Sequence, residues 1–249
     1  MIMKPIAPDQ AKKQDIIDEL LKNLPPETAV EVSLPSESKV YNLPDPLGII
    51  TLRPMTFEDE KALVTTPQGQ DPINIILSRC CTNINIGELL PMDKLYLIMK
   101  LREISYGDDY NTVLICPQCN HENPTKIKLS QLNVNPVPDD FEDPVKVMLP
   151  SLGKEGKVRL PRLIDEKFMK TTEESLSNIW RFVVELDGHT DKHIIATVLK
   201  KLPIKDMRVI LKAMKTDYGV DTKVKFDCAG CKIQSVVELP IDSNFFDVN

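Results

Sequence analysis

The sequence predicts an α+β fold of two duplicated helical units, each carrying a zinc-ribbon-like hairpin, with a further helix at the N-terminus. The motif Cys-x-x-Cys occurs twice, at Cys116–Cys119 and at Cys228–Cys231, and each copy follows a Tyr-Gly-x-Asp sequence after six residues. Proline and lysine positions upstream of the two motifs match at the same offset. Repeats of this length usually arise by duplication of one folding unit.

Composition places the chain among soluble globular proteins. It has 249 residues, of which 42% are hydrophobic and only 5% aromatic, so aliphatic side chains must fill the core. The net charge of −6 disfavours non-specific nucleic-acid binding, which needs a basic surface. No apolar run approaches a membrane span, and the N-terminus lacks the apolar segment of a signal peptide. We therefore expect a protein of a reducing cytoplasm.

The first half reads as a helical unit followed by a hairpin. Apolar residues at helical spacing predict a helix from Pro8 to Leu24, and Pro25 ends it. Short strands are predicted around Val30 and Val32 and from Ile49 to Leu52. Further helices are predicted at 56–63, 72–81 and 91–105, and strands at 111–115 and 126–129.

Local signals define where several of these helices begin and end. Thr56 is an N-cap candidate, and Asp59 occupies the acidic position of a capping box. Gly107 follows the helix predicted to end at Ser105. Glycine readily adopts the left-handed backbone found past a helix terminus, so we expect the helix to stop there. Cys80 and Cys81 continue an apolar stretch and are expected to pack in the core.

The second half repeats the first. Leu149-Pro150-Ser151 matches Leu34-Pro35-Ser36, and Arg159 and Asp165 match Arg53 and Asp59. A helix from Ser175 to Leu186 is expected to replace the helix at 72–81, residues 191–202 to form an added helix, and Pro203–Thr216 to align without gaps on Pro91–Ile104. The predicted organisation is residues 1–33 as an N-terminal helix and strand, 34–132 as the first unit, 133–148 as a linker and 149–249 as the second unit.

The four knuckle cysteines predict a structural metal site. Two Cys-x-x-Cys pairs supply the four thiolates of a closed tetrahedral zinc site, so we expect Cys116, Cys119, Cys228 and Cys231 to share one structural Zn²⁺. Three alternatives stay open. Each pair can be a redox dithiol, or bind its own ion with His121, His189 or His193, or consist of buried thiols without metal.

The sequence shows no catalytic motif. It lacks a phosphate-binding glycine loop, a Gly-x-Ser-x-Gly elbow and a His-Glu-x-x-His helix. At the other end of the chain, Phe245 and Phe246 either pack back on the body or dock into a partner, and we expect them to pack back.

The order of several short motifs resembles one viral family. The motifs are Leu34-Pro35-Ser36 followed by Tyr41, then Leu52–Thr56 with Glu58–Lys61, and finally the Cys228–Cys231 knuckle followed by Leu239-Pro240 and Phe245-Phe246. In this order they resemble the baseplate hub and hub assembly proteins of T-even-type tailed phages, most closely the hub assembly catalyst of that group.

This resemblance implies a non-enzymatic phage morphogenesis factor made in the host cytoplasm. It would assist assembly of the central hub of the tail baseplate through contacts with other phage baseplate hub proteins. The alternatives are a structural hub subunit that remains in the virion, a zinc-ribbon nucleic-acid-binding protein and a redox enzyme. The sequence does not predict the oligomeric state.

Overall fold

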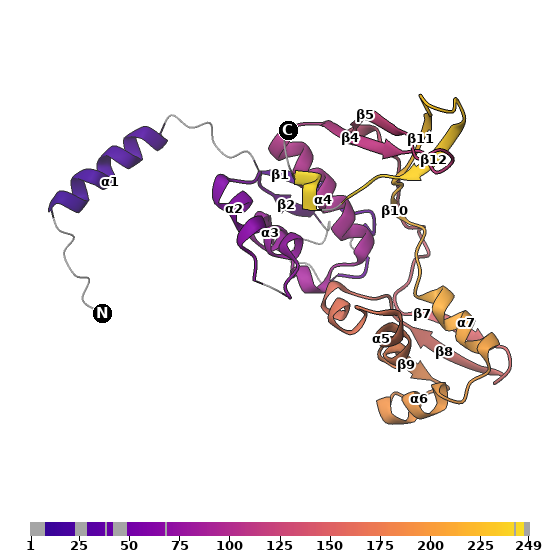
Figure 1. Cartoon of the computed structure of the whole chain (residues 1–249). Coiled ribbons are helices and arrows are strands. Elements are labelled where there is room, and N and C mark those ends of the chain that lie inside the picture. The colour runs from indigo at the N-terminus through magenta and orange to yellow at the C-terminus, as the bar shows by residue number, and fades with distance from the viewer. Residues whose placement is uncertain are drawn as a thin grey trace.

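The structure is a computed structural model that describes residues 8–22, 29–37, 39–41, 49–67, 69–241 and 243–246. It is a mixed fold of α-helices and small antiparallel sheets (Figure 1), as the predicted α+β class requires. None of its described helices has the length and apolar character needed to cross a bilayer. The elements form a first body, a second body and a four-stranded ribbon, besides the helix α1.

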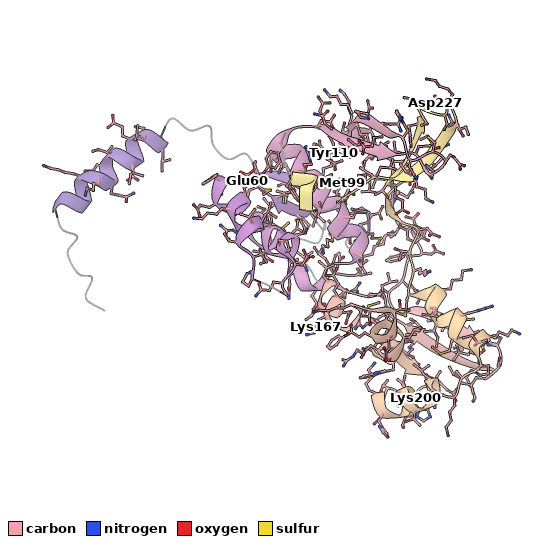
Figure 2. All side chains as sticks on the ribbon, viewed as in Figure 1. Glu60, Met99, Tyr110, Lys167, Lys200 and Asp227 are labelled. Carbon is pink, nitrogen blue, oxygen red and sulfur yellow. The ribbon has the colours of Figure 1, made fainter. Side chains whose placement is uncertain are left out.

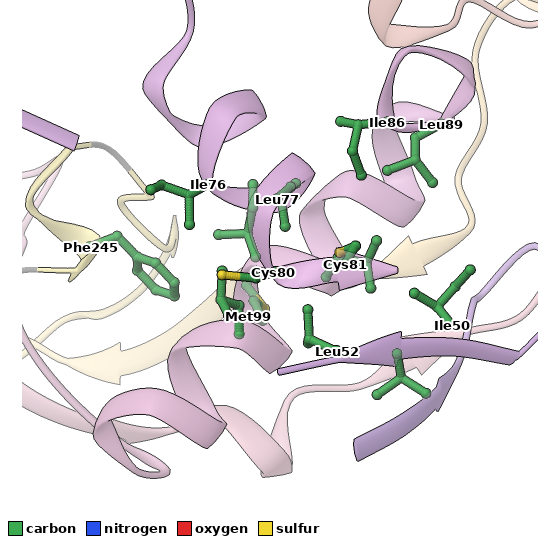
Figure 3. Packing of buried hydrophobic residues seen from close by; sticks show 14 of the residues in the cluster. Ile50, Leu52, Ile76, Leu77, Cys80, Cys81, Ile86, Leu89, Met99 and Phe245 are labelled. Carbon is green, nitrogen blue, oxygen red and sulfur yellow. The ribbon is translucent and has the colours of Figure 1, made fainter. Parts of the chain in front are cut away.

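The first body is a three-stranded sheet covered by helices. Its elements are β1 (Val30–Ser33), β2 (Ile49–Leu52), α2 (Phe57–Thr65), α3 (Pro72–Cys80), β3 (Cys81–Thr82) and α4 (Pro91–Tyr106). The antiparallel sheet has the order β1-β2-β3. Its core joins side chains of β2, α3 and α4 (Figure 3), and Cys80 and Cys81 are buried there as predicted.

Two predicted helix boundaries of the first body are confirmed by their contacts. Thr56 is the N-cap of α2, and its backbone N–H and its hydroxyl both donate to the carboxylate of Asp59, at 3.0 and 2.9 Å. Gly107 follows α4 with a φ of 94° and donates its N–H to the carbonyl of Glu103 at 3.0 Å. Glycine adopts this φ without the Cβ clash that other residues suffer.

The second body is also a three-stranded sheet with helices. Its elements are β7 (Val145–Leu149), β8 (Lys154–Val158), α5 (Thr172–Ser177), β9 (Val183–Leu186), α6 (Lys192–Leu199) and α7 (Ile204–Ala213). The antiparallel sheet has the order β7-β8-β9. Short 3₁₀ turns complete it at Leu163–Phe168 and Ile179–Arg181. Its separate core centres on Phe182, which is fully buried.

The helix predicted from Ser175 to Leu186 is wrong. Within that range only the end of α5 is α-helical, Ile179–Arg181 form a 3₁₀ turn, and Val183–Leu186 form β9, which pairs with β8. The reason is local: Val183 and Val184 are β-branched and favour a strand, and Asp187 and Gly188 turn the chain with φ angles of 50° and 79°. In addition, Val145–Met148, which the sequence analysis assigned to the linker, belong to β7.

The ribbon consists of two antiparallel hairpins. The first is β4 (Asp109–Ile115) with β5 (Glu122–Lys128), and the second is β11 (Lys223–Asp227) with β12 (Gln234–Glu238). Each hairpin holds one Cys-x-x-Cys knuckle in its loop. The strands predicted at 111–115 and 126–129 are thus confirmed as β4 and β5, although β5 already begins at Glu122.

The same hydrogen bonds recur in the two bodies. Arg53 forms a bidentate ion pair with Asp59 at 2.7 and 3.2 Å, and Arg159 forms one with Asp165 at 2.7 and 2.9 Å. Each arginine also donates to the carbonyl of the proline or leucine that follows it. These are the residues that the sequence comparison matched.

A second matched contact corrects the predicted helix alignment. The N–H of Ser36 donates to Asp93 in α4 at 3.1 Å, and the N–H of Ser151 donates to Asp206 in α7 at 2.8 Å. Both aspartates lie at the third helical position, since α4 starts at Pro91 and α7 at Ile204. Pro203 is the residue before α7, so the gapless alignment of Pro203 on Pro91 is wrong by one residue.

The two bodies are also joined outside the ribbon. The strand β6 (Val134–Asn135) pairs with β10 (Gly219–Val220), and Leu90, Met92, Val137 and Leu160 form a small shared core. The ammonium group of Lys94 lies 3.4 Å from the carboxylate of Glu166.

The tail returns to the first body, as the sequence analysis expected. Phe245 and Phe246 are 0% and 2% exposed, and the Nε–H of Arg102 donates to the carbonyl of Phe245 at 2.7 Å. Tyr110 packs edge-on against Phe245 with ring centroids 4.8 Å apart.

The helix α1 (Pro8–Leu21) is present as predicted, and its described side chains, from Lys12 onward, are all exposed. The predicted end of this helix at Leu24 and Pro25 lies outside the described residues.

Candidate metal centre

The four knuckle cysteines come together at the end of the ribbon. Their Sγ atoms all lie within 4.8 Å of one another, although the two knuckles are far apart in the sequence. Figure 2 labels Asp227, the residue before the second knuckle, at the end of the ribbon remote from Tyr110. Among the described residues, this is the one cluster of three or more His, Cys, Asp or Glu side chains whose donor atoms can hold a metal ion.

Two short sulfur–sulfur contacts link one knuckle to the other. Cys116 Sγ lies 3.7 Å from Cys231 Sγ, and Cys119 Sγ lies 3.6 Å from Cys228 Sγ. A tetrahedral ion with metal–sulfur bonds of about 2.3 Å requires sulfur–sulfur separations of about 3.8 Å. The observed geometry therefore matches four-coordinate binding of one ion, and the four cysteines can coordinate a metal.

The two knuckles have the same backbone conformation. The N–H of Cys116 donates to the backbone carbonyl of His121 at 3.0 Å, and the N–H of Cys228 donates to the backbone carbonyl of Ile233 at 3.1 Å. The residue after the second cysteine, Asn120 in one knuckle and Lys232 in the other, has a positive φ of 57° and 62° respectively. This turn folds the chain back so that both sulfurs of a knuckle point the same way.

The first cysteine of each knuckle is buried and hydrogen-bonded. Burial opposes ionisation of Cys116, but donation from the N–H groups of Gln118 and Cys119 and from the Ser235 hydroxyl lowers the pKa of its thiol to about 6. The N–H groups of Cys231 and Gly230 likewise lower the pKa of the Cys228 thiol against the effect of burial. Both sulfurs are thus prepared to act as thiolates, which is the form that binds metals.

The exposed cysteine Cys119 shows the electrostatic cost of gathering sulfurs. The N–H of His121 donates to the sulfur of Cys119 and favours the thiolate. Desolvation of that sulfur and the three neighbouring cysteines outweigh this hydrogen bond and raise the pKa of the Cys119 thiol to about 12. Several thiolates at this separation repel one another, and a divalent cation removes that repulsion.

The geometry favours one shared ion over the alternatives left open by the sequence. All six described cysteines are free thiols, and sulfur contacts of 3.7 and 3.6 Å cross between the knuckles, so that all four knuckle sulfurs gather in one cluster. His121 packs against Gly230 of the second knuckle, with its Cβ and Cγ 2.9 Å from where a Cβ on that glycine would be, and it is not among the four clustered donors. His189 and His193 belong to the second body, beside β9 and in α6.

Sequence reasoning found the four cysteines and missed the polar residues around them. Asn123 and Ser235 are buried, at 7% and 6% exposure, and both contact cysteine sulfurs. Asn123 and Ser235 stand at equivalent positions after the two knuckles, and the sequence alone shows this equivalence. An asparagine and a serine, however, do not look like a matched pair.

Comparison with known proteins identifies the family. A search of curated proteins and of solved structures returned no match. The sequence model of the family described as T4 bacteriophage base plate protein matches residues 25–247, which include both bodies, the ribbon and the tail. The chain therefore belongs to the T4-type phage baseplate protein family.

Proposed function

We propose that this baseplate protein is a non-enzymatic morphogenesis factor, which assists assembly of the central hub of the tail baseplate by contacting other hub proteins in the host cytoplasm. The observation that carries the proposal is the extent of the family match, residues 25–247, which leaves little of the chain for a separate catalytic domain. The candidate metal centre supports it, because the four sulfurs would fill all four positions of a tetrahedral ion and leave none for a substrate.

The metal in this proposal is Zn²⁺ in a structural role. Four thiolates in tetrahedral arrangement are typical of structural zinc sites, and soft sulfur ligands disfavour Mg²⁺ and Ca²⁺. Cys116, Cys119, Cys228 and Cys231 would hold the ion and so connect the two hairpins of the ribbon.

The duplicated organisation is part of the same proposal. The matched ion pairs of Arg53 and Arg159, the matched acceptors Asp93 and Asp206, and the equivalent knuckles support two copies of one unit. In this interpretation the copies begin with the strands β1 and β7 and end with the hairpins β4–β5 and β11–β12, and the metal would bind one knuckle from each.

The charge distribution of the ribbon favours protein partners over nucleic acid. Lys126 pairs with Asp109 at 2.7 Å, and Lys223 lies opposite Glu238 across the second hairpin. Two of the basic side chains on these hairpins thus face acids, whereas a nucleic-acid site needs a continuous basic stripe.

The function is tested in infected cells. A phage unable to make this chain should accumulate baseplate parts without completed hubs, and finished wild-type particles should lack the chain when analysed by mass spectrometry. Particles that contain the chain in stoichiometric amount would instead establish the alternative, a structural hub subunit. Normal hub assembly without the chain would contradict both.

The shared site is tested by metal analysis of the purified protein. Cys116→Ser and Cys228→Ser should lose bound Zn²⁺ to the same extent, because each removes one of four ligands to one ion. Cys81→Ala, a change to a core cysteine outside the cluster, serves as the control and should retain the metal. Loss of half the metal in each of the two knuckle variants would mean two separate sites.

A further inference from the structure

Two buried polar side chains cross between the knuckles in a matched way. Asn123 follows the first knuckle and Ser235 follows the second, at equivalent positions in β5 and β12. The amide Nδ2 of Asn123 lies 3.8 Å from the sulfur of Cys228, and the hydroxyl of Ser235 lies 3.7 Å from the sulfur of Cys116. Each side chain therefore reaches the first cysteine of the opposite knuckle.

We infer that Asn123 and Ser235 are positioning residues of the metal centre, each orienting a ligand of the other hairpin, and that Asn123 is the principal connection between the knuckles. The inference rests on the proposed metal site. Hydrogen-bond donors around ligand sulfurs orient them and offset their negative charge, and such outer contacts commonly change metal affinity by about 10- to 100-fold.

Asn123 makes more contacts than Ser235. Its Nδ2 also lies within hydrogen-bond distance of the carbonyls of Leu114 and His121, at 3.2 and 2.9 Å, so its two hydrogens are shared among these carbonyls and the sulfur, and the side chain stays fixed to its own hairpin. Its Oδ1 accepts the N–H of Ala229 at 2.8 Å, inside the opposite knuckle. One amide side chain thus satisfies donors and acceptors of both hairpins.

The difference between the two positions has a chemical explanation. Ala229 has an N–H that needs an acceptor, and the Asn123 carboxamide oxygen provides one. The equivalent residue in the first knuckle is Pro117, which has no N–H to offer. A hydroxyl at position 235 can serve Cys116 as a donor, and an asparagine there would bury a carboxamide oxygen without a donor.

The first experiment measures metal affinity with Co²⁺ in place of Zn²⁺, using competition with a chelator of known affinity and the sulfur-to-cobalt charge-transfer band. Asn123→Leu should weaken Co²⁺ binding by about 10-fold or more and Ser235→Ala by a smaller factor, with the four-sulfur spectrum retained. Glu122→Gln, at the exposed neighbouring position of β5, is the control and should bind as the wild type does.

The outcomes separate this inference from the metal proposal. Wild-type protein without bound metal overturns both. Wild-type binding together with unchanged affinity in Asn123→Leu and Ser235→Ala overturns the positioning role alone. Circular dichroism of each variant shows whether it folds. If Asn123→Leu does not fold, Ser235→Ala tests the same idea with a milder change.

The second experiment tests the role of Pro117 with a double-mutant cycle. Ser235→Asn alone should lower the Co²⁺ affinity, because its carboxamide oxygen lacks a donor. In a Pro117→Ala background, which restores an N–H, the same substitution should cost less or improve binding. Equal effects of Ser235→Asn in both backgrounds would overturn the proposed matching of residue 235 to residue 117.

Discussion

At the scale of single residues, charged side chains in the interior are held by dense local contacts. Asp59 is fully buried and receives hydrogen bonds from Arg53, from Arg79 at 2.6 Å and from Thr56. A buried carboxylate is tolerated only when such partners replace its water. The sequence predicted the contact of Asp59 with Thr56, because it is local, but not the contact with Arg79, which requires α3 to pack on α2.

Replacing Asp59 with alanine should destabilise the protein. The change leaves Arg53 and Arg79 without their carboxylate, and breaking a buried ion pair costs about 3 kcal/mol or more. Urea unfolding followed by circular dichroism measures the free energy of unfolding. Glu60→Gln, an exposed neighbour in α2, should change it by less than about 0.5 kcal/mol. A similar small effect of Asp59→Ala would contradict the interpretation.

The same carboxylate predicts acid sensitivity. Burial opposes ionisation of Asp59, but hydrogen bonds from Arg53 and Thr56 hold its pKa well below the usual value in the folded state. A carboxylate with a depressed folded pKa adds stability that is complete above its unfolded pKa of about 3.9 and is lost as the pH falls below that value. The urea concentration at the midpoint of unfolding should therefore decrease as the pH is lowered from about 5 to about 3. The decrease should be smaller in Asp59→Asn.

At the scale of elements, the hairpins of the ribbon depend on a close approach between knuckles. A Cβ on Gly230 would lie 2.9 Å from the Cβ and Cγ of His121, which is too close for van der Waals contact. Gly230 does not have a positive φ. Its missing side chain instead makes room for the opposite knuckle.

Gly230→Ala should push the hairpins apart and weaken metal binding. The chelator competition described above measures the loss, and Gly87→Ala is the matched control, since a Cβ there meets its nearest atom at 3.4 Å. The double variant Gly230→Ala, His121→Ala should regain part of the affinity because it removes the clashing ring. Unchanged affinity in Gly230→Ala would show that the knuckles adjust freely.

The tail element makes a separate energetic prediction. Phe245→Ala should lower the free energy of unfolding by about 3–5 kcal/mol, the usual cost of removing a fully buried aromatic ring. Phe57→Ala is the control, because Phe57 is 76% exposed and its loss should cost little. Equal losses of the free energy of unfolding in Phe245→Ala and Phe57→Ala, measured by urea unfolding, would contradict the packing of the tail.

At the scale of the whole molecule, the sequence predicted the elements that carry local signals and the pairing of the knuckles. The caps, the β4–β5 hairpin and the return of Phe245 followed from spacing and from the burial of aromatic rings. The strand β9 was missed because Ile179, Phe182 and Val183 suit a helix as well as a buried strand. The crossing contacts of Asn123 depend on how two distant hairpins meet, which no local pattern records.

Metal removal tests how the bodies are held together. The bodies share the β6–β10 pairing and the small core around Leu90 and Leu160 besides the ribbon. A chelator should therefore raise amide hydrogen exchange in β4, β5, β11 and β12, while α3 and α7 keep their protection. The apparent binding free energy of a structural zinc site is on the order of 10 kcal/mol. The increase in amide hydrogen exchange in the ribbon should therefore be large. Uniform loss of protection would mean that the ion stabilises the whole fold.

The position of Phe245 in the first core has a consequence for biosynthesis. Leu239, Phe245 and Phe246 belong to the same buried cluster as Ile50 and Leu77, which are translated far earlier. Until residues 239–246 have been synthesised and have left the ribosome, that interior stays incomplete. Maturation of the first body is thus postponed until this later segment is available.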